Sequence, residues 1–208
     1  MDSLPPLPAH LDAEVRALAA RFGPTAAVVA DLPDGLFDPL VKIDRVGEVC
    51  MVIRRPGGRL LTARKDLYPA GVFRLLTGGV SHGETVEAAL LREVAEETSL
   101  EVTIRRLLAV IAYRAPGAPL ATDGLPPFVF YTFAFLLDER GGTLAVQDPA
   151  ERVEAFREIE PAELPALAAS LEQLEDRRDR AIGGSWRSWG IFRAVVHRVV
   201  AEQLALAG

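Results

Sequence analysis

The chain has 208 residues and a mass of 22.5 kDa, which fits one domain with additions at its ends. Half of the residues are hydrophobic and 25% are charged, a balance that allows a buried core and excludes disorder of the whole chain. Acidic residues outnumber basic ones by 29 to 23, and the net charge of −6 would repel a nucleic-acid backbone. Nucleic acid is therefore not an expected partner, and work on phosphates would require divalent cations to offset like charges.

The cysteine content and the hydropathy pattern indicate the compartment. Cys50 is the only cysteine, so an intrachain disulfide is excluded, and its apolar neighbours predict a thiol packed in a strand. The N-terminus lacks a basic segment followed by an apolar one, and no run of roughly 18 apolar residues is free of charges. These features predict a soluble cytoplasmic protein that does not bind a membrane.

The first 44 residues are expected to form an accessory segment. Apolar residues at helical spacing over 11–22 predict a helix that ends at Gly23-Pro24. A short strand is predicted over 26–30, and the prolines and glycine of 31–40 predict a loop.

Strands dominate the next part of the chain. Residues 46–54 and 60–64 are predicted strands on either side of a hairpin turn, and an apolar run over 73–76 predicts a third strand. A glycine loop at Gly78-Gly79 then leads to a helix over 85–98, for which Thr85 is the expected N-cap.

The remaining elements mix strands with two helices. Strands are predicted over 107–113, 128–137 and 153–157, and the Pro/Gly-rich loop over 115–127 is long enough to shape a pocket. Helices are predicted over 163–178 and 188–206. The aromatic residues Trp186, Trp189 and Phe192 could stack on a base, but their spacing favours packing of the last helix onto the domain.

The helix over 85–98 carries the residues best suited to chemistry. At about 100° per residue, Glu93, Glu96 and Glu97 fall within an arc of roughly 100° beside the buried face. Such close carboxylates repel one another unless a cation lies among them, and hard oxygen ligands favour Mg²⁺ or Mn²⁺. Taken alone, the run over 92–97 is more typical of a solvated helix face.

The glycines that precede this helix fit a metal or phosphate site. Without Cβ atoms, Gly78 and Gly79 let backbone groups approach a phosphate or a metal closely. The carbonyl of Gly78 could join the carboxylates as a metal ligand.

The wider spacing changes the interpretation of the acidic run. Gly78, Glu84, Arg92-Glu93, Glu96-Glu97 and the apolar Leu100 stand at the intervals of the Nudix box, so residues 78–100 resemble the Nudix hydrolase family. The resemblance implies an α/β fold, namely an α/β/α sandwich with a mixed sheet over about 45–160. A helical N-terminal extension over 1–44 and C-terminal helices over 161–208, packed on the same domain, would lie outside it.

The resemblance also implies roles for the residues of the box. Glu93 and Glu97 would be the principal metal ligands, Glu96 a further ligand or the base that deprotonates water, and Gly78 a carbonyl ligand. Arg92 would hold a glutamate in place by an ion pair. Mg²⁺ would be the cofactor, with Mn²⁺ as a substitute.

The sequence departs from the family pattern at two places. Ser99 stands where glycine usually ends the helix, and a non-glycine residue in a left-handed conformation costs about 1 kcal/mol. Leu76-Thr77 replaces the Pro-Gly that many members carry before the glycines, which affects the loop shape and the substrate preference rather than the carboxylates.

Residues outside the helix are candidates for contact with substrate. Arg64 and Lys65 are placed to meet phosphate charge, and Gly79 could approach it through its backbone. Glu154 lies in a region where some relatives carry an additional metal-binding or basic glutamate.

These features predict a Mg²⁺-dependent pyrophosphohydrolase that cleaves a nucleoside diphosphate linked to another moiety, such as ADP-ribose or a nucleotide sugar. A nucleoside triphosphate pyrophosphatase is the alternative within enzymes, because loops outside the box set the substrate. A non-catalytic ligand-binding module of the same fold is a third reading. The terminal segments could cover a pocket or form a homodimer, and the sequence does not choose between these uses.

Overall fold

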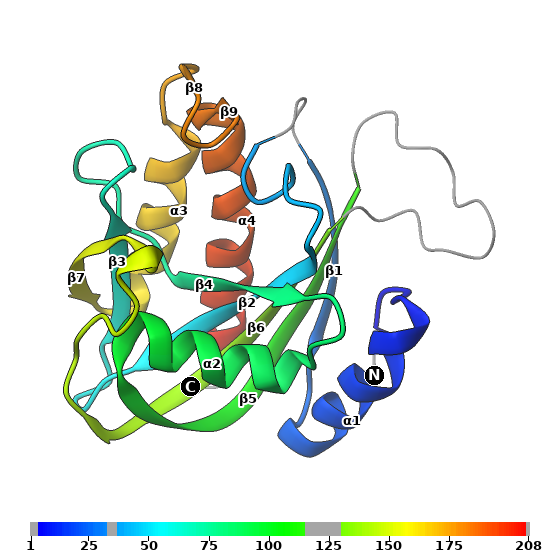
Figure 1. The fold of residues 1–208 in the computed structure, drawn as a ribbon. Helices are drawn as coiled ribbons and strands as arrows, with labels where there is room; N and C mark the ends of the chain where they lie inside the picture. The colour runs from blue at the N-terminus through cyan, green and yellow to red at the C-terminus, as the bar shows by residue number, and fades with distance from the viewer. Residues whose placement is uncertain (1–3, 33–36, 115–129, 207–208) are drawn as a thin grey trace.

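A computed structural model describes residues 4–32, 37–114 and 130–206. It shows a β-sheet between two helical layers, with α1 and α2 on one face and α3 and α4 on the other (Figure 1). The mixed α/β architecture with helices at both ends of the chain is therefore confirmed. The predicted loop over 115–127 lies outside the described residues, as do residues 33–36 of the predicted loop over 31–40.

The regular elements follow one another from α1 near the N-terminus to α4 near the C-terminus. In chain order they are α1 (Ala9–Phe22), β1 (Ala26–Asp31), β2 (Arg45–Arg54), β3 (Leu60–Lys65), β4 (Leu76–Ser81), α2 (Val86–Thr98), β5 (Leu100–Arg114), β6 (Phe130–Gly142), η1 (Pro149–Glu151), β7 (Val153–Ile159), η2 (Pro161–Glu163), α3 (Leu164–Glu172), β8 (Arg178–Asp179), β9 (Gly184–Ser185) and α4 (Trp186–Ala205).

The sheet has the strand order β1-β5-β6-β2-β3-β7, and β4 pairs with β2 beside this path. The pairs β1–β5 and β2–β6 are parallel, whereas β2–β3, β2–β4, β3–β7 and β5–β6 are antiparallel. None of the helices in the described part of the chain is both long and apolar enough to cross a membrane.

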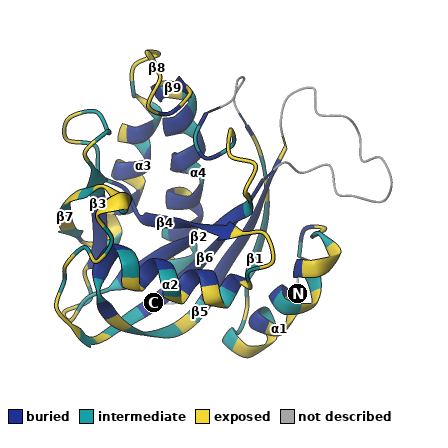
Figure 2. Cartoon of the chain, viewed as in Figure 1, coloured by how far each residue is buried: buried dark blue, intermediate teal, exposed yellow. Residues whose placement is uncertain are grey.

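Strand β2 is buried on both faces because each face meets a helical layer (Figure 2). Side chains alternate along a strand, so Val49, Met51 and Ile53 join the cluster beneath α1 and α2, whereas Cys50 and Val52 join the cluster beneath α3 and α4. The expected buried thiol of Cys50 is confirmed. A continuous apolar run is what a strand covered on both faces requires.

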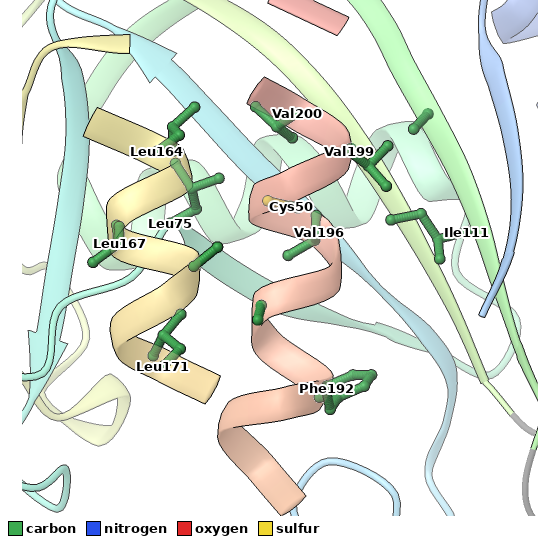
Figure 3. Close-up of a cluster of buried hydrophobic side chains, with 14 of the residues drawn as sticks. Cys50, Leu75, Ile111, Leu164, Leu167, Leu171, Phe192, Val196, Val199 and Val200 are labelled. Carbon is green, nitrogen blue, oxygen red and sulfur yellow. The ribbon is translucent and has the colours of Figure 1, made fainter. Parts of the chain in front are cut away.

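Helix α4 is held on the sheet by its apolar face. Figure 3 shows Phe192, Val196, Val199 and Val200 of α4 beside leucines of α3. Trp186 and Trp189 at the start of α4 are 1% and 2% exposed and pack edge to face. The prediction that these aromatic residues anchor the helix is confirmed.

The glycines ahead of α2 lie in a strand, which corrects the predicted order. The sequence placed a strand over 73–76 and a loop at Gly78-Gly79, but both glycines belong to β4 and pair with Val49 and Glu48 of β2. Glycine has a weak strand propensity, and here the pairing with β2 overrides it. The turn before α2 therefore comes later, after Ser81.

Three other boundaries differ from the predictions. The strand predicted over 107–113 lies within the longer β5, and residues 130–137 of the strand predicted over 128–137 lie in the longer β6, whereas residues 128–129 are outside the described residues. The added residues of β5 and β6 pair with each other. The helix predicted over 163–178 ends at Glu172, and a small β8–β9 pair follows. Residues after 172 are mostly charged and offer no apolar face to continue the helix.

Helix α2 has a side-chain cap at its N-terminal end and ends with a residue in the left-handed backbone conformation. The Thr85 hydroxyl accepts a hydrogen bond from the Ala88 amide at 3.2 Å, so the predicted N-cap is confirmed. Ser99 ends the helix in the left-handed region with φ 55° and ψ 18°.

Replacing Ser99 with glycine should stabilise the protein. Ser99→Gly relieves the Cβ strain at a positive φ, and we expect the free energy of unfolding to rise by about 0.5–1 kcal/mol. Urea denaturation measures the change. Ser99→Ala keeps the Cβ and should show no such gain, so an equal gain in both variants would contradict this account.

A buried ion pair ties α4 to β2. Arg193 Nη1 lies 2.7 Å and 2.6 Å from the two carboxylate oxygens of Glu48, and both side chains are 4% exposed. Thr132 also donates to Glu48 at 3.1 Å. Such a pair is balanced while both partners are present, but either charge alone is costly to bury.

Glu48→Gln should therefore lower the free energy of unfolding by about 3–5 kcal/mol, because Arg193 loses its counter-charge. The matched control is Glu172→Gln, which breaks an exposed pair with Arg198. The control should change stability by less than about 0.5 kcal/mol. Equal effects of the two substitutions in urea denaturation would show that burial of the Glu48 pair does not matter.

Candidate active site

Three carboxylates from two elements converge beside α2. Oxygen atoms of Glu93, Glu96 and Glu151 all lie within 4.8 Å of one another. Glu93 and Glu96 stand on α2, whereas Glu151 comes from η1, which brings it to the helix from a distant part of the chain. Glu97 lies on the same side of α2 and is 1% exposed.

Arg92 holds the carboxylates of α2 in place. Its Nη1 donates to Glu93 and Glu96 at 2.9 Å each, and its Nε donates to Glu84 at 2.8 Å. Its Nη2 donates to the carbonyl oxygen of Gly79 at 3.0 Å. The hydrogen bond to Glu84 and the other two carboxylates raise the pKa of Arg92, so the guanidinium keeps its charge at this position.

Lys65 links the buried glutamate to η1. Its Nζ lies 2.9 Å from Glu97 Oε1 and 2.8 Å from Glu151 Oε2. Burial raises the pKa of Glu97 to about 7, although the charge of Lys65 opposes the shift. Burial acts in the same direction on Glu151, but there the hydrogen bond and charge of Lys65 outweigh it and leave the pKa below its usual value.

Two buried carboxylate oxygens of the site, Glu93 Oε2 and Glu97 Oε1, lack a hydrogen-bond donor among the described residues. The ion-pair contact of Lys65 with Glu97 Oε1 does not have hydrogen-bond geometry. Burial also raises the pKa of Glu93 against the opposing effect of Arg92. Buried oxygens without donors and elevated pKa values fit a hard divalent cation as the missing partner.

The absence of a side chain at Gly78 makes room for the Glu93 carboxyl group. A Cβ atom on Gly78 would overlap the Glu93 carboxyl group, so only glycine permits this approach of β4 to α2. The residues present therefore fit a Mg²⁺ or Mn²⁺ site built from Glu93, Glu96, Glu97 and Glu151.

A cavity of about 260 Å³ adjoins the carboxylates. Glu151 belongs to the carboxylate cluster and also lines the cavity. Lys65 and Gly78, which lie against glutamates of the site, line the cavity as well. Its walls come from β2, β4, η1, residues 38–42, the β8–β9 turn and α4. Six of its lining side chains are cationic: Lys42, Arg45, Lys65, Arg74, Arg152 and Arg193.

A family model described as the NUDIX domain matches residues 44–180. The chain belongs to the Nudix hydrolase family. The match confirms the resemblance carried by residues 78–100, and it extends beyond the predicted domain end at 160 into α3 and β8.

Three similar proteins illustrate the family. An ADP-ribose pyrophosphatase of Methanocaldococcus jannaschii is 36% identical over 123 residues, which cover 59% of this chain and 66% of that protein. The NAD-capped RNA hydrolase NudC of Pasteurella multocida is 29% identical over 48% of this chain and 33% of that protein. A MutT NUDIX hydrolase of Burkholderia pseudomallei has a crystal structure that covers 77% of this chain and 98% of that one, with 24% identity and a TM-score of 0.42. The aligned regions thus span about two thirds or less of the first two relatives.

The structure divides the predicted substrate residues of this Nudix protein into two groups. Lys65 lies among the carboxylates, and Gly79 meets Arg92 through its carbonyl oxygen. Arg64 and Glu154 instead form an ion pair with each other at 3.0 Å, and neither lines the 260 Å³ cavity. Their charges are thus directed at each other and not toward the Nudix helix.

Sequence reasoning missed three residues that the fold brings to the site. Glu151 lies three residues before the predicted Glu154, and its contact with α2 depends on the tertiary path of η1. Arg74, just before β4, and Arg193 on α4 both line the cavity. An arginine inside the apolar run 72–76 is the one local signal that could have indicated Arg74.

Proposed function

We propose that this Nudix protein hydrolyses a phosphoanhydride bond in a nucleoside diphosphate linked to a second moiety, with Mg²⁺ as cofactor. The observation that carries the proposal is the position of the carboxylate cluster of Glu93, Glu96 and Glu151 at the edge of a cavity lined by six cations. Carboxylates suit the metal, and the cations suit the phosphates that a metal would bridge.

The reaction forms one bond and breaks one bond. Water adds to a phosphorus of the diphosphate, the bond to the bridging oxygen breaks, and the products are a nucleoside monophosphate and the phosphorylated second moiety. Bound Mg²⁺ would lower the pKa of water and neutralise charge on the phosphates.

The chain's own residues would position the carboxylates and accept the proton. Arg92 fixes Glu93 and Glu96 through hydrogen bonds of 2.9 Å. Glu96 or Glu97 would accept the proton from water. Lys65 would stabilise negative charge that develops on the phosphate side.

A substrate panel tests the proposed class. The panel contains ADP-ribose, nucleotide sugars, the dinucleotide NADH, dinucleoside polyphosphates and nucleoside triphosphates, each with Mg²⁺ or Mn²⁺, and chromatography separates the phosphate-containing products. The M. jannaschii relative is named as an ADP-ribose pyrophosphatase, which supports ADP-ribose as the first compound to test. Cleavage to a monophosphate and a phosphorylated partner is expected. Release of inorganic pyrophosphate from triphosphates alone would contradict the class, and silence with every compound would favour a binding module.

A further inference from the structure

Arg74 is a buried arginine in the wall of the cavity. Its side chain is 4% exposed and donates from Nε to the Tyr68 hydroxyl at 2.7 Å. Its Nη1 donates to the Leu75 carbonyl at 2.7 Å and to the Thr77 hydroxyl at 3.0 Å. Neutral oxygens therefore orient the guanidinium, but they do not balance its charge.

The other cations of the cavity wall each have a carboxylate partner. Arg193 pairs with Glu48 at 2.6 Å, and Lys65 pairs with Glu97 and Glu151. The three remaining pairs are Lys42–Asp38 at 3.1 Å, Arg45–Asp44 at 2.8 Å and Arg152–Asp66 at 2.8 Å. Within residues 4–32, 37–114 and 130–206, no carboxylate forms a salt bridge with Arg74.

Glu97 and Glu48 attract Arg74 electrostatically without forming a salt bridge with it. A buried cation without a direct ionic contact is costly unless an anion completes the site. Arg193 adds to this demand, because its buried Nε has no hydrogen-bond partner among the described residues. Both arginines line the same cavity, which also adjoins Gly78 and Glu151 of the proposed metal site. An anion in the cavity would thus lie next to the position where the reaction takes place.

The segments outside the predicted domain of 45–160 close this cavity. Asp38 and Lys42 precede that domain, and Trp189 and Arg193 of α4 follow it. A volume of about 260 Å³ is small for a whole nucleotide-linked substrate and suits one phosphorylated part of it. The terminal segments thus supply part of the cavity wall.

We propose that Arg74 recognises a phosphoryl group of the substrate in the cavity that residues 38–42 and α4 close over β4. The anion pairs with the one lining guanidinium that forms no salt bridge with a described carboxylate, and Tyr68 and Thr77 hold that guanidinium in position. The identity of the anion as a substrate phosphate rests on the proposed function. The presence of an anion site does not.

Calorimetric titration with inorganic phosphate tests the proposal without any turnover. The wild-type protein is titrated once in EDTA and once with saturating Mg²⁺, and binding is expected in at least one condition. Arg74→Gln should weaken that binding by at least about tenfold, because a charge-assisted hydrogen bond is lost. Arg74→Lys, which keeps the charge, should retain part of the affinity.

Arg54→Gln is the matched control, because Arg54 pairs with Asp138 on β2 and does not line the cavity. Its phosphate affinity should equal that of the wild type. A wild-type protein that binds no phosphate at about 10 mM in either condition would overturn the proposal, as would equal affinity of folded Arg74→Gln and wild type.

Tyr68→Phe decides the question if Arg74→Gln does not fold. It removes the hydroxyl that accepts the hydrogen bond from Arg74 Nε and leaves the charge of Arg74 in place, so phosphate affinity should fall by about threefold. Unchanged affinity would overturn the proposal.

AMP is titrated in parallel with phosphate. Tighter binding of AMP than of phosphate, lost in the same variants, supports a substrate phosphate as the anion, whereas binding of free phosphate alone counts against a substrate phosphate. Phosphate binding without hydrolysis of any panel compound would separate this anion site from a failure of the proposed function.

Discussion

Glu97→Gln is expected to lower kcat/KM at saturating Mg²⁺ by roughly 10²–10³-fold, because it removes a carboxylate that would bind the metal or accept the proton. Glu97 Oε1 is buried beside Lys65 and lacks a hydrogen-bond donor in the described residues, so a metal or a water proton could add to it. Burial raises the pKa of Glu97 to about 7, so a charged carboxylate is costly at this position. The neutral amide of glutamine avoids that cost, and the fold should persist. Steady-state kinetics and urea denaturation of the same preparation measure the two effects.

Glu87→Gln provides the control on the same helix. Glu87 faces away from the cluster and pairs with Arg21 at 3.0 Å. Its kcat/KM should stay within about twofold of wild type, since it contacts no reacting group. Activity of Glu97→Gln within about threefold of wild type would remove Glu97 from the active site.

Gly78→Ala is expected to lower kcat/KM by at least about 100-fold and to weaken Mn²⁺ binding, because the new Cβ displaces a carboxylate that we propose binds the metal. The added methyl group would overlap the Glu93 carboxyl, which is 5% exposed and held by Arg92 at 2.9 Å. Glu93 must then leave the position it shares with Glu96 and Glu151. Mn²⁺ titration followed by electron paramagnetic resonance measures the loss of metal affinity directly.

Gly79→Ala separates this effect from a general strain in β4. A Cβ on Gly79 would meet the guanidinium of Arg45, the end of a side chain that is 20% exposed and can move. The loss of activity should be about tenfold or less. If Gly79→Ala and Gly78→Ala lost Mn²⁺ affinity equally, the fit between Gly78 and Glu93 would not explain the result.

The sequence predicts the carboxylates of α2 because the helical period alone determines which side they occupy. Glu93, Glu96 and Glu97 share one side of α2 in the structure, and the Thr85 cap follows from a local residue preference. The buried strand β2 is equally local, since a continuous apolar run reports burial on both faces.

The parts that sequence reasoning missed depend on contacts between distant segments. Gly78 and Gly79 have a low strand propensity, and only the pairing with β2 makes them a strand. Glu151 reaches α2 because η1 returns to it after β6, a path that no local pattern indicates. Arg74 lies in an apolar run, and the cavity that it lines takes part of its wall from α4 and residues 38–42, which are distant in sequence.

Chelation of the metal tests the central claim most directly, which is that the carboxylate cluster supports metal-dependent hydrolysis. The panel compound that is cleaved fastest is incubated with Mg²⁺, with EDTA, and with EDTA followed by excess Mg²⁺, and the products are separated by chromatography. We expect a nucleoside monophosphate and the phosphorylated partner with Mg²⁺, no products in EDTA, and full recovery when Mg²⁺ is restored. Hydrolysis that continues unchanged in EDTA would contradict the account.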